Sequence, residues 1–306
     1  METPLVSVVV ISYNASKSII ETLDSIKSQT YSPLELIIAD DCSKDDTAIK
    51  CKDWLTVNQG RFVRSKLIVN EENKGVSANL NIGIQSSTGE WIKVFGDDIL
   101  LPDAIEKNVA FAIENDSEMV VSKVKYFSDE TKEVLRIIPK DDYIFPVSSH
   151  EQFLAHIQQV LVNPTPTWFY KRTLYDRLGG INERYRLSED VPFAFKMLES
   201  GGRFSYLPEV TVLYRITNTS LSNNKQSTGK QRQPYYESRS AVYYELHAPA
   251  LKKNKLWGTL MLYNMQWFLY KKKIYSKDTS LKRYFYGALL FVIASLLSIR
   301  RKKLYF

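Results

Sequence analysis

Two pairs of adjacent aspartates, Asp40-Asp41 and Asp97-Asp98, each follow an apolar run in this sequence of 306 residues. Carboxylates gathered at one place repel one another unless a cation or a cation-bearing ligand joins them. Mn²⁺ or Mg²⁺ typically takes one or two carboxylates, several waters and the phosphate oxygens of a substrate. One aspartate after a strand is commonly a turn or cap residue, whereas two such pairs at equivalent places favour a functional site. The pairs therefore predict a ligand site, and Asp97-Asp98 would suit a divalent cation that neutralises phosphate.

Alternating strands and helices are predicted over the first 115 residues. The predicted strands are 5–12, 34–39, 66–69 and 90–95, and the clearest helices are 19–26, 76–86 and 102–115. Repeated units of this length predict a parallel sheet with helices on both faces. In such sheets ligands bind beyond the carboxyl ends of the strands. We therefore expect Ser12-Tyr13-Asn14 and the two aspartate pairs to converge on one edge of the sheet.

The sequence lacks the motifs of several common ligand sites. No G-x-G-x-x-G follows the first predicted strand and no G-x-x-x-x-G-K-[ST] occurs, so neither a dinucleotide site nor a P-loop is supported. The three histidines, His150, His156 and His247, do not have the spacing of zinc ligands. Phosphate must then be neutralised in another way, for which a divalent ion held by carboxylates is the simplest device.

The composition excludes two broad classes of protein and shows an uneven charge. With 44% hydrophobic and 25% charged residues, the chain is neither wholly disordered nor a polytopic membrane protein. Its net charge is +7, but residues 230–306 hold 16 Lys/Arg, three Asp/Glu and 16 of the 38 aromatic residues, so the rest is mildly acidic. A basic, aromatic tail on an acidic body predicts attachment to a polyanionic surface.

Residues 230–306 lack the strand–helix alternation and are predicted to be helical. The stretch from Tyr284 to Ile299 carries no charge over 16 residues, which as a helix gives about 24 Å against the roughly 30 Å of a hydrocarbon core. We therefore expect a helix in the membrane interface, with flanking Lys and Arg against anionic headgroups. The alternative is a helical arm that packs on the body or on a second copy in a homo-oligomer. No nucleic-acid-binding module accompanies the charge, so nucleic acid is not an expected partner.

The expected location is cytoplasmic, at the inner face of the cell membrane. No leader of basic and then apolar residues precedes the first predicted strand, so we expect no signal peptide. Two cysteines, Cys42 and Cys51, are too few for a disulfide framework and fit a reduced compartment. The basic tail would hold the protein peripherally at the membrane.

Five blocks of sequence follow one another along the chain. They are VSVVVISYN, SIKSQTYSPLELIIADDCSKDDT, NKGVSANLNIGI, TGEWIKVFGDDILLPDAI and RLGGINERYRLSEDVPFAFKMLESG, within about residues 5–222. Together they resemble glycosyltransferase family 2, which has the GT-A fold. The resemblance implies an α/β fold with a mixed, mainly parallel central sheet flanked by helices, followed by the helical tail. It implies a nucleotide-sugar-binding half over 1–115 and an acceptor-binding half over 116–229, to which the composition adds a region for membrane-surface or subunit contact over 230–306.

On the nucleotide side, the resemblance assigns a role to residues of all three clusters. Tyr13 matches a residue that packs on the base, and Asp40 matches the carboxylate that hydrogen-bonds the uracil ring. Asp97 matches the position near the ribose, and Asp98 matches the ligand of the Mn²⁺ or Mg²⁺ ion on the diphosphate. The other residues assigned to the nucleotide-sugar site are Ser12, Asn14, Lys74 and Asn81.

On the acceptor side, Asp190 matches the general base of the family, and Glu189 beside it is the second candidate. Helix capping is the alternative role for Asp190, because acidic residues favour the first turn of a helix. Trp168 could line an acceptor pocket, since aromatic faces suit the CH surfaces of sugars; a place in the core is equally compatible with the sequence.

The implied reaction is a metal-dependent transfer with inversion from a nucleotide sugar, UDP-linked in the first instance. The expected acceptor is a hydroxyl of a glycan, free or carried on a polyprenyl diphosphate lipid, as in the synthesis of O-antigen or capsule. Two alternatives are a catalytically inactive, membrane-docked scaffold and a sugar-1-phosphate nucleotidyltransferase. The loop SYNASKS lacks the glycine- and basic-rich character that the nucleotidyltransferase needs after its first strand.

Three positions depart from the family pattern, and one of them is Thr217, which stands in place of a histidine that would give a further metal or phosphate contact. Phe95 stands where many relatives have another aspartate, which leaves the metal to Asp98 almost alone. Leu80 stands in place of a common arginine, so the diphosphate charge is assigned to Lys74, the metal or Arg215.

Overall fold

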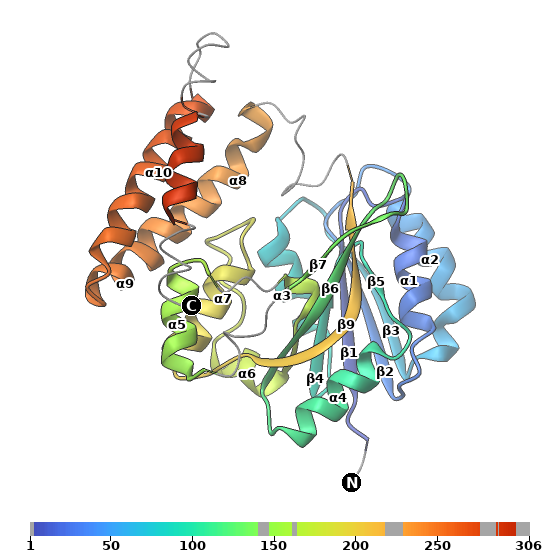
Figure 1. Cartoon of the computed structure of the whole chain (residues 1–306). Coiled ribbons are helices and arrows are strands. Elements are labelled where there is room, and N and C mark those ends of the chain that lie inside the picture. Colours follow the sequence, from blue (N-terminus) through green and yellow to red (C-terminus); the bar gives the residue numbers. More distant parts are fainter. Residues whose placement is uncertain are drawn as a thin grey trace.

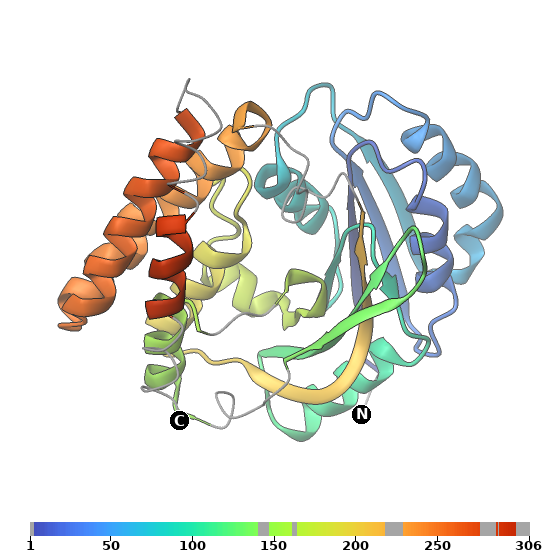
Figure 2. The ribbon, with the colours of Figure 1, turned by 45° about the horizontal axis from the view of Figure 1, so that its top comes forward.

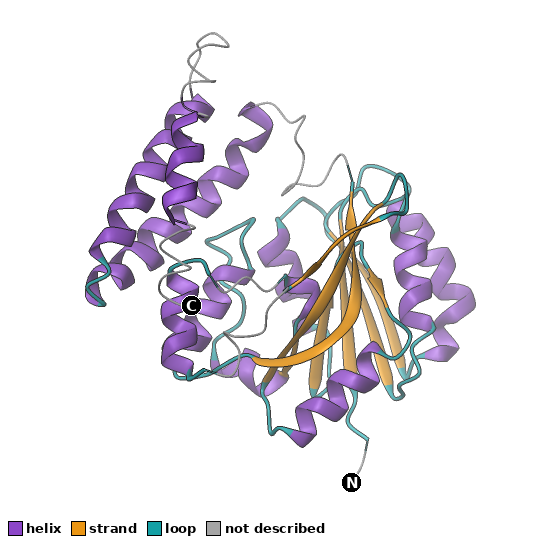
Figure 3. Cartoon of the chain, viewed as in Figure 1, coloured by secondary structure: helices purple, strands orange, loops and turns teal. Residues whose placement is uncertain are grey.

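A sheet of nine strands with helices on both faces makes up most of the protein (Figure 1 and Figure 3). The structure is a computed structural model that describes residues 3–139, 147–160, 164–217, 229–275, 286 and 288–297. The strands are β1 (Val6–Ser12), β2 (Leu34–Asp40), β3 (Arg64–Val69), β4 (Trp91–Phe95), β5 (Ile99–Leu100), β6 (Met119–Ser128), β7 (Val134–Ile138), β8 (Phe169–Lys171) and β9 (Ser205–Ile216). The helices are α1 (Ile19–Lys27), α2 (Thr47–Asn58), α3 (Val76–Gln85), α4 (Ala104–Glu114), α5 (Ser149–Ile157), α6 (Arg172–Arg177), α7 (Asp190–Glu199), α8 (Gly229–Val242), α9 (Ala248–Lys253) and α10 (Trp257–Tyr275). Three short turns are η1 (Gln59–Arg61), η2 (Thr165–Thr167) and the π-helical η3 (Tyr243–His247).

Strands β1 to β4 run parallel in the order β3-β2-β1-β4, which brings their carboxyl ends to one edge. Ser12 lies opposite Asp40, and Val10 lies opposite Phe95. The strands and helices predicted for the first 115 residues are confirmed, with ends that differ by at most two residues.

The valines of β1 explain why this part of the sheet needs continuous apolar runs. Val6, Val8 and Val10 pack in the cluster formed with α1, α2 and α4, whereas Val9 packs in the cluster formed with α3 and α7. Alternate residues of a strand point to opposite faces. A strand that is covered by helices on both faces therefore has to be apolar at every position.

The second half of the sheet has mixed strand directions. β6 pairs in parallel with β9 and antiparallel with β7 and β8. β8 also pairs with β4, and β5 pairs with β9, so that one sheet runs across the predicted boundary at residue 115. The predicted α/β class, with a mixed sheet between helices, is confirmed.

The carboxyl-terminal region is a layer of helices beside α5 and α7 (Figure 1 and Figure 2). It consists of α8, α9, α10 and a helical segment over 288–297. The Tyr263 hydroxyl donates to the Gln158 carbonyl of the body (2.7 Å), and Tyr243 and Leu251 are at most 1% exposed. The predicted helical character of 230–306 is confirmed for its described residues.

The uncharged stretch predicted as an interfacial helix is described only at 286 and 288–297. Leu290, Ile293 and Leu297 pack in the core, while Phe291 on the other side of the segment is 74% exposed. The basic residues predicted to flank it, at 282–283 and 300–303, lie outside the described residues. Within the described part of the chain, no helix is both long and apolar enough to cross a membrane.

Candidate active site

The three polar clusters meet at the carboxyl edge of the parallel strands, as the sequence predicted. Ser12 Oγ donates to Asp40 Oδ2 (2.9 Å) across the ends of β1 and β2. Thr22 in α1 donates from its hydroxyl to the Asp98 carbonyl (2.8 Å), which fixes the turn after β4 to the same edge.

Asp40 is fully buried and holds the turn that follows β2. Besides the Ser12 hydroxyl, it accepts hydrogen bonds from the Ser43 hydroxyl (2.6 Å) and the Ser43 N–H (2.9 Å). These three donors satisfy the oxygens of the carboxyl, because a buried polar group is stable only when it is hydrogen-bonded. A direct bond from Asp40 to a uracil ring stays a prediction.

Asp41 shapes the loop before α3. It accepts hydrogen bonds from the N–H groups of Lys74 and Gly75 (both 2.8 Å), which leaves the Lys74 side chain exposed at the edge of the sheet. Gly75 has φ +88°, and a Cβ there would lie 2.3 Å from Arg186 Cγ. Only glycine permits both this conformation and this approach.

Tyr13 and Asn14 form an open surface beyond β1. Tyr13 is 51% exposed. Asn14 accepts a hydrogen bond from the Lys44 N–H (2.7 Å) and donates its own N–H to the Ser43 hydroxyl (2.8 Å), so the loop is fixed while the Tyr13 ring is free to contact a ligand.

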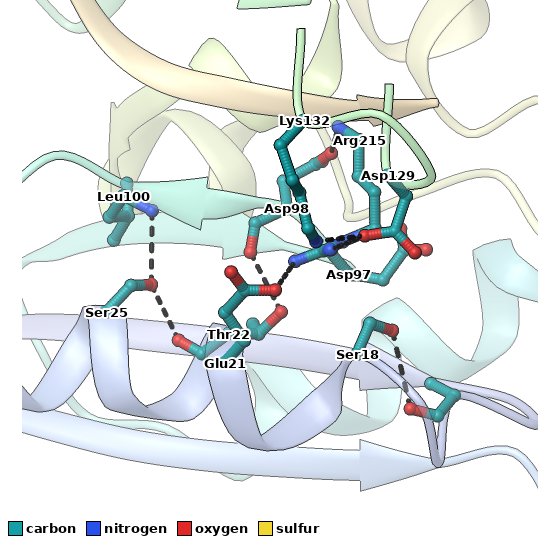
Figure 4. A network of polar contacts seen from close by, with 11 residues as sticks. Ser18, Glu21, Thr22, Ser25, Asp97, Asp98, Leu100, Asp129, Lys132 and Arg215 are labelled. Atoms are coloured by element: carbon teal, nitrogen blue, oxygen red, sulfur yellow. Dashed lines mark hydrogen bonds and ion pairs between the residues drawn. The ribbon is translucent and has the colours of Figure 1, made fainter. Parts of the chain in front are cut away.

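Asp97-Asp98, here called the strand pair, is held by Arg215 from β9 (Figure 4). The Arg215 N–H donates to Asp98 Oδ1 (2.8 Å), and its Nε donates to the Asp97 carbonyl (2.7 Å). Its terminal nitrogens form ion pairs with Glu21 (2.7 Å) and with Asp129. Arg215 is therefore committed to contacts within the fold, which corrects the idea that it meets the charge of a diphosphate.

The carboxyl of Asp98 has the chemistry of a site for a hard cation. It is 3% exposed; burial raises its pKa well above the usual range, and the charge of Asp97 adds to the shift, against Arg215 and Lys93. Its Oδ2 accepts no hydrogen bond from the described residues. Mg²⁺ and Mn²⁺ need only one or two protein carboxylates when phosphate oxygens and waters complete the shell. The strand pair fits that role, although the described residues contain no group of three or more His, Cys, Asp or Glu that could hold a metal alone.

Glu189-Asp190, here called the helix pair, lies at the start of α7. Glu189 Oε1 accepts a hydrogen bond from the Thr165 hydroxyl (3.2 Å); burial raises the pKa of Glu189 to about 7, and the Asp190 charge adds to the shift. Asp190 Oδ1 accepts from the N–H of Val191 (2.8 Å), so the carboxylate is held at the first turn of the helix. A carboxyl with a pKa near neutrality is suited to proton transfer.

Contacts join the loop before α3, which Asp41 holds, to the segment that leads into the helix pair. The Ser77 hydroxyl at the start of α3 donates to the Tyr185 carbonyl (2.7 Å), and Arg186 Nη2 donates to the Asn73 carbonyl (2.7 Å). The loop after β3 and the segment leading to the helix pair are therefore one structural unit.

Two predicted site residues lie elsewhere. Trp168 is 3% exposed and packs with its ring centroid 6.0 Å from those of Phe193 and Phe204, so it belongs to the core and not to an acceptor pocket. Asn81 accepts hydrogen bonds from the Tyr175 hydroxyl (2.8 Å) and the Ile181 N–H (3.0 Å). It fixes the loop after the two glycines at 179–180 and does not point to the strand ends. A cavity of about 680 Å³ beside this loop is lined by Asn81 but by neither acidic pair.

Thr165 and Arg239, both near Glu189, belong to segments without a recognisable motif. Thr165 contacts Glu189 directly, and the charge of Arg239 on α8 lowers the pKa of Glu189. Both come from parts of the chain that only the fold brings to α7. Leu80 is 1% exposed in the core, which leaves Lys74 as the exposed cation predicted for the diphosphate.

Comparisons with known proteins give one family. The profile of "Glycosyl transferase family 2" matches residues 7–179, more than half of the chain. An uncharacterized glycosyltransferase of Haemophilus influenzae is 39% identical over 233 residues, which are 73% of this chain and 70% of that protein. The succinoglycan biosynthesis protein ExoO of Rhizobium meliloti is 25% identical over 228 residues, which are 72% of this chain and 63% of that protein.

Solved structures share the fold at low sequence identity. The mannosyltransferase PcManGT from Pyrobaculum calidifontis, in complex with GDP-Man and Mn²⁺, has a TM-score of 0.60 and 21% identity over 96% of this chain and 81% of that chain. S. aureus TarS 1-349 in complex with UDP-GlcNAc has a TM-score of 0.57 and 18% identity over 94% of this chain and 71% of that chain. The fold of this protein is accordingly GT-A. With the profile match and the 39% identity, the chain belongs to glycosyltransferase family 2.

Proposed function

We propose that this glycosyltransferase moves a sugar, with inversion, from a UDP-sugar to a hydroxyl of a glycan or lipid-linked glycan in surface-polysaccharide synthesis. The observation that carries the proposal is the buried carboxyl of Asp98 beside Asp97, at the edge where Tyr13 is open. The complex of TarS with UDP-GlcNAc supports a UDP donor, and the name of ExoO supports a polysaccharide product. The complex of PcManGT with GDP-Man makes GDP-sugars the competing donor class.

The donor binds along the carboxyl edge of the sheet, within the half formed by residues 1–115. The base stacks on Tyr13 beside Ser12 and Asn14, and the ribose lies near Asp97. The ammonium group of Lys74, which the loop before α3 leaves exposed, lies toward the diphosphate. Asp40 holds the ends of β1 and β2 in register beneath the base.

Asp98 would hold Mn²⁺ or Mg²⁺ through the oxygen that accepts no hydrogen bond from the described residues. When bound, the ion neutralises the negative charge that grows on the diphosphate as the sugar leaves. Arg215 keeps the carboxyl in place through its N–H, and Asp97 adds negative charge at the same point.

Asp190 takes the proton of the attacking acceptor hydroxyl within the half formed by residues 116–229. The acceptor oxygen forms a bond to the anomeric carbon, the bond to the diphosphate oxygen breaks, and the proton passes to the Asp190 carboxylate. A positioned base of this kind contributes roughly 10²–10⁴-fold. Glu189 is the second candidate for the base. Burial and the charge of Asp190 raise its pKa, and it accepts a hydrogen bond from the Thr165 hydroxyl.

Thermal unfolding with UDP or GDP, each with and without Mn²⁺, tests the proposal. A ligand at 100 times its dissociation constant stabilises a protein by about 2.7 kcal/mol. We expect UDP and Mn²⁺ together to stabilise the protein more than either alone and more than GDP with Mn²⁺. Equal or larger stabilisation by GDP with Mn²⁺ would mean that the donor is a GDP-sugar. No joint stabilisation by nucleotide and Mn²⁺ would favour the inactive scaffold.

We also propose that residues 230–306 attach the protein to the inner face of the cell membrane. Trp257, Met261, Met265 and Phe268 are 48–59% exposed and follow one another by four, four and three positions, along one face of α10. Exposed apolar faces of this kind mark interaction sites, and the net positive charge of the region favours anionic headgroups.

Vesicle sedimentation tests the membrane proposal. Replacing Trp257, Met261 and Phe268 together by serine should reduce binding to anionic vesicles roughly tenfold or more, because the buried apolar area is lost. The matched control replaces Ile49 and Val57, which are 63% and 82% exposed on α2. Unchanged sedimentation of the triple variant, with a smaller species in size-exclusion chromatography, would instead identify α10 as a subunit interface.

A further inference from the structure

Helix α8 lies against the segment that leads into the helix pair. The Leu187 N–H donates to the Ser238 hydroxyl of α8 (3.2 Å). One segment further on, Glu245 of η3 receives two hydrogen bonds from Arg184 (2.5 and 2.6 Å). The inner side of the carboxyl-terminal layer is therefore fixed next to the helix pair.

Arg239, the residue after Ser238, brings a positive charge to this place. Burial raises the pKa of Glu189 to about 7 and lowers that of His156 to about 4; the Arg239 charge opposes the first shift and adds to the second. The guanidinium is thus within electrostatic reach of the helix pair. It is half-buried, yet it makes no hydrogen bond or ion pair with any residue in the described ranges.

Other polar groups around Arg239 also lack partners. The Ser188 hydroxyl and both ring nitrogens of His247 are buried and have no hydrogen-bond partner within the described part of the chain. Tyr235 lies one helical turn before Arg239 on the same face of α8. Burial raises the pKa of Tyr235, the Arg239 charge opposes that shift, and both carboxylates of the helix pair add to it. Buried polar groups are normally hydrogen-bonded, so this group of donors and acceptors without described partners indicates a place for a ligand.

We propose that Arg239 binds an oxyanion of the acceptor, next to the hydroxyl that is deprotonated at the helix pair, with Tyr235 along the same acceptor. A guanidinium offers a planar fork of donors that matches a phosphate or a carboxylate. Two carboxylates at the start of α7 would repel an anionic acceptor, and a free cation opposite them removes that penalty. The inference rests on the proposed function, because it names the acceptor class as anionic.

Calorimetric titration of the full chain tests the proposal with three geranyl-linked acceptor probes, two of which carry the same sugar. They are N-acetylglucosamine on geranyl diphosphate, the neutral geranyl glycoside of the same sugar, and the geranyl glycoside of glucuronic acid. We expect the wild type to bind one or both anionic probes roughly 10–100-fold more tightly than the neutral one. Preference for the diphosphate places the anion on the lipid side, and preference for the glucuronide places it on the sugar.

In Arg239→Gln the preference should fall to about two- to threefold, and Arg239→Lys should keep part of it because the charge remains but the fork is lost. Arg203→Gln, which removes an exposed arginine after α7, is the control for net charge. A wild type that binds all three probes equally overturns the inference, as does an Arg239→Gln that weakens all three alike. Stabilisation by UDP and Mn²⁺ is measured in parallel; its absence in the wild type would refute the proposed function without affecting the calorimetric comparison.

Discussion

The strand pair and the helix pair have the same chemical composition of two adjacent carboxyls, but the arginine near each is used differently. Arg215 is 2% exposed, and its guanidinium bonds to Glu21, to Asp129 and to the Asp97 carbonyl. Arg239 is half-buried and bonds to none of the residues that the structure describes. The first arginine positions a carboxyl pair, whereas the second is available to a ligand.

The difference follows from where each pair lies in the fold. The strand pair is at the end of β4 in a turn that β9 covers, so a buried cation is needed to hold the turn and to balance its charge. The helix pair is at the amino terminus of α7, where the N–H groups and the helix dipole already favour negative charge. Its arginine forms no hydrogen bond or ion pair with the residues that the structure describes. An arginine that is fully paired and one that bonds to no described residue therefore indicate different roles, even when both lie beside carboxylates.

The sharpest test of the strand pair is Asp98→Asn. Asparagine keeps an oxygen for the Arg215 N–H but removes the charge that a divalent ion requires, so the fold should survive. We expect Mn²⁺-linked UDP binding to be lost and transfer to fall by roughly 10³-fold or more. The measurements are thermal shift with UDP and Mn²⁺ and steady-state turnover, with Asp53→Asn on the exposed side of α2 as the control. Normal Mn²⁺-linked binding by the variant would mean that another residue holds the ion.

The corresponding test of the helix pair is Asp190→Asn. We expect the turnover rate to fall by roughly 10²–10⁴-fold while the affinity for the nucleotide sugar stays within about twofold, because a base acts only in the chemical step. Stopped-time product assays and nucleotide titration measure the two quantities. If Asp190→Asn turns over normally and Glu189→Gln does not, the base is Glu189.

A third test concerns Arg215→Met, which separates a positioning role from a ligand-binding role. Removing one partner of a buried ion pair is strongly destabilising. Glu21 and Asp129 are 48% and 33% exposed at their side chains, so we expect a loss of about 2–3 kcal/mol. Urea unfolding measures it. The control is Lys132→Met, which removes a 60% exposed partner of Asp129 and should change stability by at most about 0.5 kcal/mol. If UDP binding weakened and the free energy of unfolding stayed unchanged, Arg215 would bind the diphosphate and would not be a positioning residue.

The strand pair could be predicted from the sequence because its position follows from local structure. An apolar run long enough for a strand, followed by aspartates, fixes a residue at the edge of a parallel sheet, and Ser12, Asp40 and Asp98 are found there. The bond from Arg215 to Asp98 could not be predicted, because it joins residues 117 positions apart and depends on β9 lying beside β5.

The helix pair itself could be predicted from the sequence, but the side chains that surround it could not. The acidic residues before an apolar helix are visible in the sequence, whereas their neighbours Thr165 and Arg239 come from η2 and α8. The sequence characterises the region of Arg239 only by its net charge, and net charge does not say which side chain turns inward. Trp168 was ambiguous because an aromatic side chain suits a sugar site and a core equally, and only packing against Phe193 and Phe204 decides between them.

The smallest expected effect, and the one specific to the helix pair, is the pH dependence of stability in Glu189→Gln. Glu189 has a native pKa of about 7, above the 4.5 of the unfolded chain, because burial and then the Asp190 charge disfavour ionisation. The native state therefore binds more protons between these values, and the wild type loses stability as the pH rises from about 4.5 to 7. Glutamine does not ionise, so the variant should gain on the order of 1–3 kcal/mol relative to the wild type between pH 5 and 8. Urea unfolding at both pH values measures the gain, and Glu199→Gln at the exposed end of α7 should show none. A constant difference between Glu189→Gln and the wild type would show that Glu189 is ionised throughout, and the two acidic pairs would then differ in electrostatics as well as in their arginines.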